Sequence, residues 1–191
     1  MPAALAPDTV TCRGERFRLY LDEDTIQARV RELGRQIADD YAALGPPILI
    51  GVLNGAFMFT ADLMRAIPGD CEVDFYKLSS YGEQKVSTGA ITEQKAVSAD
   101  LEGRHVVVVE DIVDTGLSMK YVLDQIAARG PASLRAATLL RKPDAATVEV
   151  EVDYVGFDID NLFVIGYGLD YGQLARNLPA VYILDEGGAE G

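Results

Sequence analysis

Apolar residues early in the chain recur first at helical spacing and then as an unbroken run. Within 24–44 they are separated by three or four residues, which predicts an amphipathic helix. The apolar positions of this helix are Ile26, Val30, Leu33, Ile37, Tyr41 and Leu44. Asp24 and Gln27 have the spacing of a capping box at its start, and Gly45 is expected to end it. The run ILIGVL at 48–53 predicts a strand buried on both faces of a parallel sheet.

Strand and helix patterns then alternate along the chain. Helices are predicted at 57–67 and 118–130, and strands at 71–78, 106–111 and 134–140. The polar segment 79–96 has no strong period and is interpreted as a loop, whereas three short β-like runs follow between 148 and 185. The alternation predicts an α/β fold with a mainly parallel central sheet flanked by helices. At 191 residues, without a repeat or a long linker, we expect a single domain.

Composition and charge exclude several functions. The net charge of −13 argues against nucleic-acid binding, which needs a basic surface. The most apolar stretch, 48–64, is interrupted by Asn54-Gly55 and carries Asp62, so it does not predict a membrane span. No signal peptide is evident at the start of the sequence, and the two cysteines lie far apart, so we expect a cytoplasmic protein with reduced cysteines. An anionic ligand would need positive potential from a metal, a helix N-terminus or a few basic residues.

Each distinctive short sequence lies at the carboxyl end of a predicted strand. These sequences occupy 54–55, 80–81, 110–118 and 141–143. In parallel α/β sheets, ligands bind at the carboxyl ends of the strands, and these ends meet at one edge of the sheet. The pattern therefore predicts a single site at that edge.

The segment VVVVEDIVDTGLSM (106–119) combines a run of valines with an acid-rich turn. A glycine turn that opens into a helix presents backbone N–H groups to an anion, and Thr115 and Ser118 add hydroxyl donors. Glu110 and Asp111 would repel a phosphate unless they bind Mg²⁺ or ligand hydroxyls. Ribose 5-phosphate with a metal-bound pyrophosphate is a ligand that suits both the acidic pair and the glycine turn. The alternative is a strand end with two acids and a helix-capping turn that binds nothing.

This segment closely resembles the phosphoribosyl-diphosphate motif of the type I phosphoribosyltransferases. Further segments are similar to the corresponding parts of hypoxanthine-guanine phosphoribosyltransferases, namely 51–63, 79–82, 139–143 and 155–179. The resemblance covers about 20–186 in the right order. It implies the type I phosphoribosyltransferase fold, in which the termini build a small hood over the sheet. The core would span about 24–145, and the hood would come from about 10–22 and 148–186.

The resemblance also implies roles at the ribose and its phosphate. Glu110 and Asp111 would hold the ribose hydroxyls, directly or through Mg²⁺. Asp114 would lie near N7 of a purine as general base or proton relay, and its charge would stabilise an oxocarbenium-like ribosyl group. The 5-phosphate would be bound by Thr115, Gly116, Leu117 and Ser118.

For the purine and the pyrophosphate, the resemblance implies five more residues. Lys142 would donate to the 6-oxo group of the base and so select against adenine. Phe163 would stack on the base, and Val164 would contact its edge through backbone groups. Asp170 would help to bind a second Mg²⁺ together with the pyrophosphate, which Arg176 would also bind.

Two loops complete the implied site. Asn54 and Gly55 would contact the pyrophosphate through backbone atoms, in a loop that has a cis peptide bond in the family. Many members carry Lys or Arg where this chain has Asn54, so the expected recognition here is by the backbone. Ser80 and Tyr81 would lie on a mobile loop that closes over the site and excludes water.

The resemblance therefore implies a cytoplasmic enzyme of purine salvage. It would convert hypoxanthine or guanine and phosphoribosyl diphosphate into IMP or GMP and pyrophosphate with Mg²⁺, as a homodimer or homotetramer. One alternative is a non-catalytic regulator that binds phosphoribosyl diphosphate, although this chain has no room for an added DNA-binding domain. The other is a transferase for another base, against which Lys142, Phe163 and Val164 argue. Neither a nucleic acid nor a membrane is an expected partner.

Overall fold

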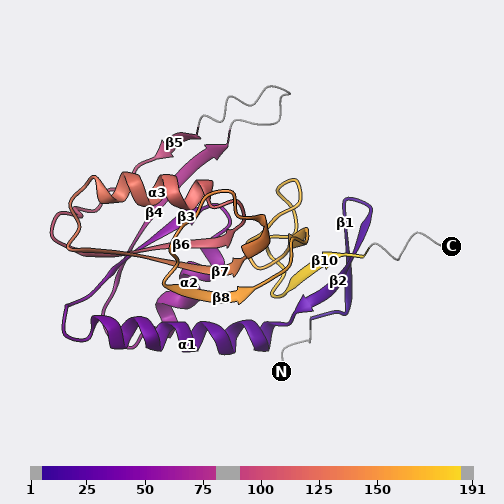
Figure 1. The fold of residues 1–191 in the computed structure, drawn as a ribbon. Coiled ribbons are helices and arrows are strands. Elements are labelled where there is room, and N and C mark those ends of the chain that lie inside the picture. Colours follow the sequence, from indigo (N-terminus) through magenta and orange to yellow (C-terminus); the bar gives the residue numbers. More distant parts are fainter. Residues whose placement is uncertain (1–5, 81–90, 186–191) are drawn as a thin grey trace.

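The computed structural model describes residues 6–80 and 91–185, and a six-stranded sheet forms its centre (Figure 1). The strand order is β5-β4-β3-β6-β7-β8. Every neighbouring pair is parallel except β5 and β4, which are antiparallel. The bounds are β3 Ile48–Leu53, β4 Glu72–Ser80, β5 Ile91–Lys95, β6 His105–Val113, β7 Ser133–Arg141 and β8 Tyr154–Asp158. The predicted parallel α/β sheet is confirmed, whereas the interpretation of 79–96 as a loop missed β5.

Helices cover both faces of this sheet. α1 (Glu23–Tyr41) and α2 (Phe57–Ala66) pack together on one face, and α3 (Leu117–Ala127) lies on the other (Figure 1). The valines of β6 explain why its sequence is continuously apolar. Val107 and Val109 belong to the core beneath α1 and α2, and Val106 and Val108 to the core beneath α3. Because successive strand residues point to opposite faces, a strand covered on both sides needs apolar residues at every position.

The start of α1 differs from the prediction. Its N-cap is Asp22, whose carboxylate accepts a hydrogen bond from the Thr25 N–H at 2.7 Å. The predicted capping box of Asp24 and Gln27 is therefore wrong, because the Gln27 side chain donates instead to Asp62 of α2 at 2.7 Å. Leu44 was also assigned to the buried face, but it follows the end of the helix and is exposed.

A second, four-stranded sheet joins the two ends of the described chain (Figure 1). Its order is β1-β2-β10-β9, and all its pairs are antiparallel. The strands are β1 Thr9–Cys12, β2 Glu15–Leu21, β9 Val164–Ile165 and β10 Val181–Leu184. A separate small core that includes Phe17 and Tyr182 packs beneath them. We use the word hood for the four-stranded sheet and its loops; β8, which lies within the expected hood segment 148–186, belongs instead to the six-stranded sheet. No helix in the described parts of the chain is long and apolar enough to cross a membrane.

Candidate active site

The acidic pair, Glu110 and Asp111, lies inside β6, which continues beyond the predicted strand 106–111 to Val113. Burial raises the pKa of Glu110, and the adjacent charge of Asp111 raises it further. Within residues 6–80 and 91–185, no side chain or loop backbone group forms a hydrogen bond or ion pair with the Glu110 carboxylate. Burial also raises the pKa of Asp111; two backbone N–H groups and Arg176 partly oppose this effect. A buried and a half-buried carboxylate with so little cationic compensation suit ligand hydroxyls or a hard cation.

The glycine turn after β6 forms the N-terminus of α3. Gly116 is the N-cap with a φ of 85°, and a Cβ atom at this position would lie 2.4 Å from the Val148 carbonyl oxygen. The Thr115 carbonyl accepts hydrogen bonds from the N–H groups of Thr147 (3.0 Å) and Val148 (3.1 Å), which fix the turn from its other side. Among the residues that the structure describes, no side chain caps α3, so the first-turn N–H groups remain available to an anion. Residues 115–118 therefore have the backbone arrangement that phosphate binding requires.

Asp114 and Lys142 form an ion pair, with Lys142 Nζ 2.9 Å from Asp114 Oδ2. The pairing follows from the sheet register, since Val113 of β6 lies opposite Arg141 of β7 and each is followed by one of the two residues. The Lys142 side chain is only 8% exposed, whereas that of Asp114 is 46% exposed. An ammonium group has three N–H donors, so Lys142 can bind Asp114 and still donate to a ligand.

Three chain segments meet around Gly55. The Leu53–Asn54 peptide bond is cis, as the resemblance implied. Gly55 lies so close to Asp111 that a Cβ atom added to it would be 1.8 Å from the Asp111 carboxylate. Gly168 packs against the Gly55 carbonyl in the same way, with only 2.1 Å left for a Cβ atom. We call this contact between residues 54–55, Asp111 and 168–176 the glycine corner.

Arg176 extends the glycine corner. Its guanidinium donates to the Gly168 carbonyl at 2.7 Å and pairs with Asp170 at 2.6 Å. The Asp170 carboxylate also accepts a hydrogen bond from the Gln173 N–H. Asp111, Asp170 and Arg176, which are far apart in sequence, therefore occupy one region of the structure.

An aromatic platform stands in the hood. Phe163 is 47% exposed, and Tyr171 packs edge-on against it at a centroid distance of 5.4 Å. Phe17 supports both rings at 6.2 Å, and the Arg13 guanidinium lies over Tyr171. Val164, in contrast, is buried in β9, with its backbone adjacent to Phe163. An exposed aromatic ring held by others is suited to stacking on a planar ligand.

Some support for the site was missed by the sequence reasoning. Tyr171, Phe17 and Arg13, which support the ring of Phe163, were not predicted, because nothing local in the sequence connects these positions. Ser80 ends β4 and its side chain is not described, and the predicted contact at Tyr81 lies outside the described residues.

The candidate metal ligands do not form a self-sufficient metal site. Among the described residues, no group of three acidic, histidine or cysteine side chains is arranged to hold a metal ion. Mg²⁺ commonly uses only one or two protein carboxylates and completes its coordination with water and substrate phosphates. Glu110 and Asp111 could supply the one or two carboxylates that such a metal needs.

Comparisons with known proteins give one consistent family. Residues 20–172 match the family model described as the phosphoribosyl transferase domain. A hypoxanthine-guanine phosphoribosyltransferase of Mycobacterium tuberculosis is 45% identical over 177 residues, which cover 90% of this chain and 88% of that protein. The enzyme of the same name from Aquifex aeolicus is 40% identical over 174 residues, 91% and 98% of the two chains. A crystal structure of a Bacillus anthracis hypoxanthine-guanine phosphoribosyltransferase, with HEPES in its active site, has a TM-score of 0.82 at 38% identity and covers 87% of this chain and 98% of that one.

Proposed function

This chain belongs to the phosphoribosyl transferase domain family, and we propose that it is a hypoxanthine-guanine phosphoribosyltransferase of purine salvage. It transfers a 5-phosphoribosyl group from phosphoribosyl diphosphate to hypoxanthine or guanine. The products are IMP or GMP and pyrophosphate.

One observation carries this proposal: an acidic pair, Asp114 and a phosphate-binding turn occupy the nine residues 110–118, and Lys142, directly after β7, pairs with Asp114. The turn 115–118 suits the 5-phosphate, and Glu110 with Asp111 suits the ribose hydroxyls. The ion pair of Asp114 and Lys142 then suits a base that offers an N–H and an oxo group. Phosphate, ribose and 6-oxopurine would thus follow one another along a single edge of the sheet.

The chemistry at the base depends on Asp114 and Lys142. Lys142 donates a hydrogen bond to the 6-oxo group, whereas the 6-amino group of adenine would present a second donor to it. Asp114 receives or relays the purine proton near N7 while N9 forms its bond to the ribose anomeric carbon. As the bond from that carbon to pyrophosphate breaks, the negative charge of Asp114 also stabilises the oxocarbenium-like ribosyl group. Phe163 stacks on the base, and backbone groups of Val164 contact its edge.

The leaving group is bound on the other side of the acidic pair. Backbone atoms of residues 54–55 and the guanidinium of Arg176 bind the pyrophosphate, and Asp170 lies beside them. Glu110, Asp111 and Asp170 are the residues that would hold Mg²⁺. When bound, Mg²⁺ neutralises the developing charge on the pyrophosphate. Ser80 and Tyr81 would help to exclude water.

The proposal includes a cytoplasmic location and an assembly of two or four copies, both supported by the family resemblance. It leaves the preference among hypoxanthine, guanine and xanthine to experiment.

Incubation of the protein with Mg²⁺, phosphoribosyl diphosphate and each of several bases tests the function. Turnover is expected with hypoxanthine or guanine, but not with adenine, orotate or uracil. Turnover with adenine alone would refute the assignment of the base. Binding of phosphoribosyl diphosphate without turnover of any base would instead favour a non-catalytic regulator.

Asp114→Asn tests the catalytic role, and Asp144→Asn is its control because Asp144 is a nearby exposed acid that forms no ion pair within the described part of the chain. We expect kcat to fall about 10²–10⁴-fold for Asp114→Asn, the usual contribution of a general acid–base group. The control should retain the activity of the unsubstituted protein. An unchanged kcat for Asp114→Asn at saturating Mg²⁺ would remove Asp114 from the mechanism.

A further inference from the structure

Tyr167 has an unfavourable backbone conformation for its residue type. Its φ is 49°, in the left-handed region that favours glycine, and it lies between Gly166 and Gly168, which also have positive φ values. Its side chain is nonetheless fully buried, at 1% exposure. A bulky residue in this region carries a backbone cost, which persists only where the surroundings stabilise it. The side chain of Tyr167 must therefore form interactions that offset this cost.

The hydroxyl group of Tyr167 forms those interactions with α2. It donates a hydrogen bond to Asp62 Oδ2 at 2.7 Å, and Gln27 of α1 donates to the same oxygen at 2.7 Å. Arg65 pairs with the other oxygen, Oδ1, at 2.6 Å. Burial and the charge of Asp62 both raise the pKa of Tyr167, so its hydroxyl stays a neutral donor. The Asp62 side chain is 17% exposed and is held by three donors from three elements of the fold.

Tyr167 and Asp62 each lie close in sequence to the glycine corner. Asp62 is on α2, which begins two residues after Gly55. Tyr167 immediately precedes Gly168, which packs against the Gly55 carbonyl. The bond between Tyr167 and Asp62 thus joins the two sides of the corner through side chains that do not themselves line it.

The effect of this bond reaches Arg176 through the backbone. The Gly168 N–H donates to the Arg176 carbonyl at 3.0 Å, and the Gly168 carbonyl accepts from the Arg176 guanidinium at 2.7 Å. Arg176 pairs in turn with Asp170. A shift of Gly168 would therefore move both of the charged groups that the proposed function assigns to pyrophosphate.

We propose that Tyr167 and Asp62 are positioning residues for the pyrophosphate end of the site. Their hydrogen bond fixes Gly168 against Gly55 and thereby orients Arg176 and Asp170. This inference rests on the proposed function for the identity of the ligand. It assigns no contact with the purine or the ribose, so the two substrates should respond differently when the bond is removed.

Tyr167→Phe removes only the hydroxyl oxygen and keeps the buried ring. We expect KM for phosphoribosyl diphosphate and Kd for Mg²⁺-pyrophosphate to rise roughly tenfold, which corresponds to about 1.4 kcal/mol. KM for the purine should stay close to that of the unsubstituted protein. Steady-state kinetics measures the two KM values, and calorimetric titration with Mg²⁺-pyrophosphate measures binding without turnover.

Tyr182→Phe is the matched control, because Tyr182 is a fully buried hood tyrosine whose hydroxyl has no hydrogen-bond partner in the described structure. It should leave both KM values unchanged. Asp62→Ala should reproduce the effect of Tyr167→Phe, and Asp62→Asn, which keeps an acceptor oxygen, should restore part of the affinity. The Tyr167→Phe and Asp62→Ala double variant should show less than the sum of the two single effects. If Asp62→Ala does not fold, the comparison of Tyr167→Phe with Tyr182→Phe decides.

Specific outcomes would overturn the inference. One is a Tyr167→Phe protein that melts at a lower temperature but binds phosphoribosyl diphosphate and Mg²⁺-pyrophosphate normally, since this would show a role in stability alone. Another is an equal KM change in Tyr182→Phe. If the unsubstituted protein turns over no base, the proposed function fails instead, and the calorimetric titration then tests the positioning role by itself. In that case, the inference would also be overturned if Tyr167→Phe and the unsubstituted protein bound Mg²⁺-pyrophosphate with equal affinity. It would equally be overturned if the unsubstituted protein did not bind Mg²⁺-pyrophosphate.

Discussion

Two acidic regions of the central sheet surround their carboxylates with opposite environments, one of which lowers the pKa while the other raises it. Asp74 of β4 and the acidic pair of β6 lie on strands that both pair with β3, and Ile50 of β3 lies opposite both Asp74 and Val108. Asp74 is therefore only two positions before Glu110 in the register of the sheet. Asp74 accepts hydrogen bonds from a cationic side chain and from several backbone N–H groups. In the acidic pair, Glu110 is buried and lies next to the like charge of Asp111.

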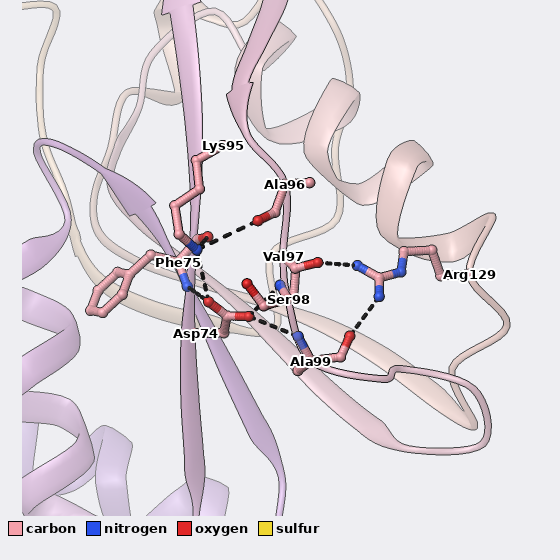
Figure 2. Close-up of polar contacts among 8 residues, drawn as sticks. All are labelled: Asp74, Phe75, Lys95, Ala96, Val97, Ser98, Ala99 and Arg129. Carbon is pink, nitrogen blue, oxygen red and sulfur yellow. Dashed lines mark hydrogen bonds and ion pairs between the residues drawn. The ribbon is translucent and has the colours of Figure 1, made fainter.

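The Asp74 clamp comprises Asp74, Lys95, Arg129 and the segment 96–99 (Figure 2). Asp74 accepts hydrogen bonds from the Lys95 ammonium at 2.9 Å and from the N–H groups of Phe75, Ser98 and Ala99 at 2.6–2.9 Å. Although burial acts to raise the pKa of Asp74, these donors outweigh it and lower the pKa to about 2. A carboxylate with this many partners stabilises the chain that leads from β5 to β6.

The acidic pair lacks such compensation. Burial and mutual repulsion raise the pKa of Glu110, and Arg176 only partly offsets the burial of Asp111. Charged groups placed like this reduce the stability of the folded protein, so their presence is better explained by a ligand than by the fold. The number of hydrogen-bond donors around a carboxylate, more than its burial, therefore distinguishes an acid that stabilises the fold from an acid of the candidate site.

Among the substitutions that compare the two regions, Asp111→Asn has the largest expected effect on activity. Loss of this charge should lower kcat/KM by about 10²–10³-fold, as for other preorganised electrostatic groups in active sites. The melting temperature should stay the same or rise, because one of two adjacent like charges is removed. Asp74→Asn is the matched control, since it makes the same change three positions earlier in the register of the same sheet. A lower stability with normal activity in Asp111→Asn would refute the distinction between the two regions.

Asp74→Asn should have the opposite signature. It removes an ionised acceptor of four hydrogen bonds, so we expect the free energy of unfolding to fall by about 1.5–3 kcal/mol. For a chain of this size, the melting temperature should fall by about 3–12 °C. The value of kcat/KM at 25 °C should remain close to that of the unsubstituted protein. Calorimetry and steady-state kinetics measure the two effects, and unchanged stability would show that the clamp contributes nothing.

The contrast between the regions explains what the sequence could predict. A run of valines requires apolar cover on both faces, so the buried position of β6 followed from 106–109 alone. The grouping of short sequences at one edge followed from the geometry of parallel strands. The partners of individual side chains did not follow. Gln27 has the spacing of a capping residue but bonds to Asp62, which is 35 residues away.

The same limit applies within the site. The pair of Asp114 and Lys142 depends on the register of β6 against β7, and the Asp74 clamp depends on a strand that the polar sequence of 91–95 did not indicate. The left-handed conformation of Tyr167 has only its flanking glycines as a local signal. Its hydrogen bond to Asp62 joins residues 105 positions apart, a separation over which a single sequence specifies no contact.

The pH dependence of stability sharpens the contrast, because the two regions should have opposite slopes. Asp74 has a lowered pKa, so its stabilisation is present above the unfolded pKa of about 4 and is lost as the pH falls toward 2. Glu110 has a raised pKa, so it favours the folded state below about pH 4, and this contribution is lost as the pH rises. Relative to the unsubstituted protein, Glu110→Gln should therefore gain stability as the pH rises from 4 to 8. Urea unfolding without substrate or Mg²⁺ measures this difference, and a constant difference across the range would contradict it.

The smallest expected effect is that of Arg129→Lys at the edge of the Asp74 clamp. The Arg129 guanidinium donates to the Val97 carbonyl at 2.9 Å and to the Ala99 carbonyl at 2.5 Å (Figure 2). Lysine keeps the charge but not the planar fork that binds both oxygens, so we expect a loss of about 0.5–1.5 kcal/mol in urea unfolding. Arg31→Lys, at an exposed position of α1 without a hydrogen bond in the described structure, is the control and should be neutral.

Arg129 and Asp74 hold the same short segment from two sides, so their contributions should depend on each other. Once Asp74→Asn has loosened residues 98–99, the fork of Arg129 has a less ordered target. Arg129→Lys should then cost less in the Asp74→Asn background than alone, with a coupling of about 0.5 kcal/mol or more. Strict additivity would mean that the two side chains act on the segment independently and that the clamp is not one unit. The acidic pair offers the reference, because Glu110→Gln combined with Arg129→Lys should be additive.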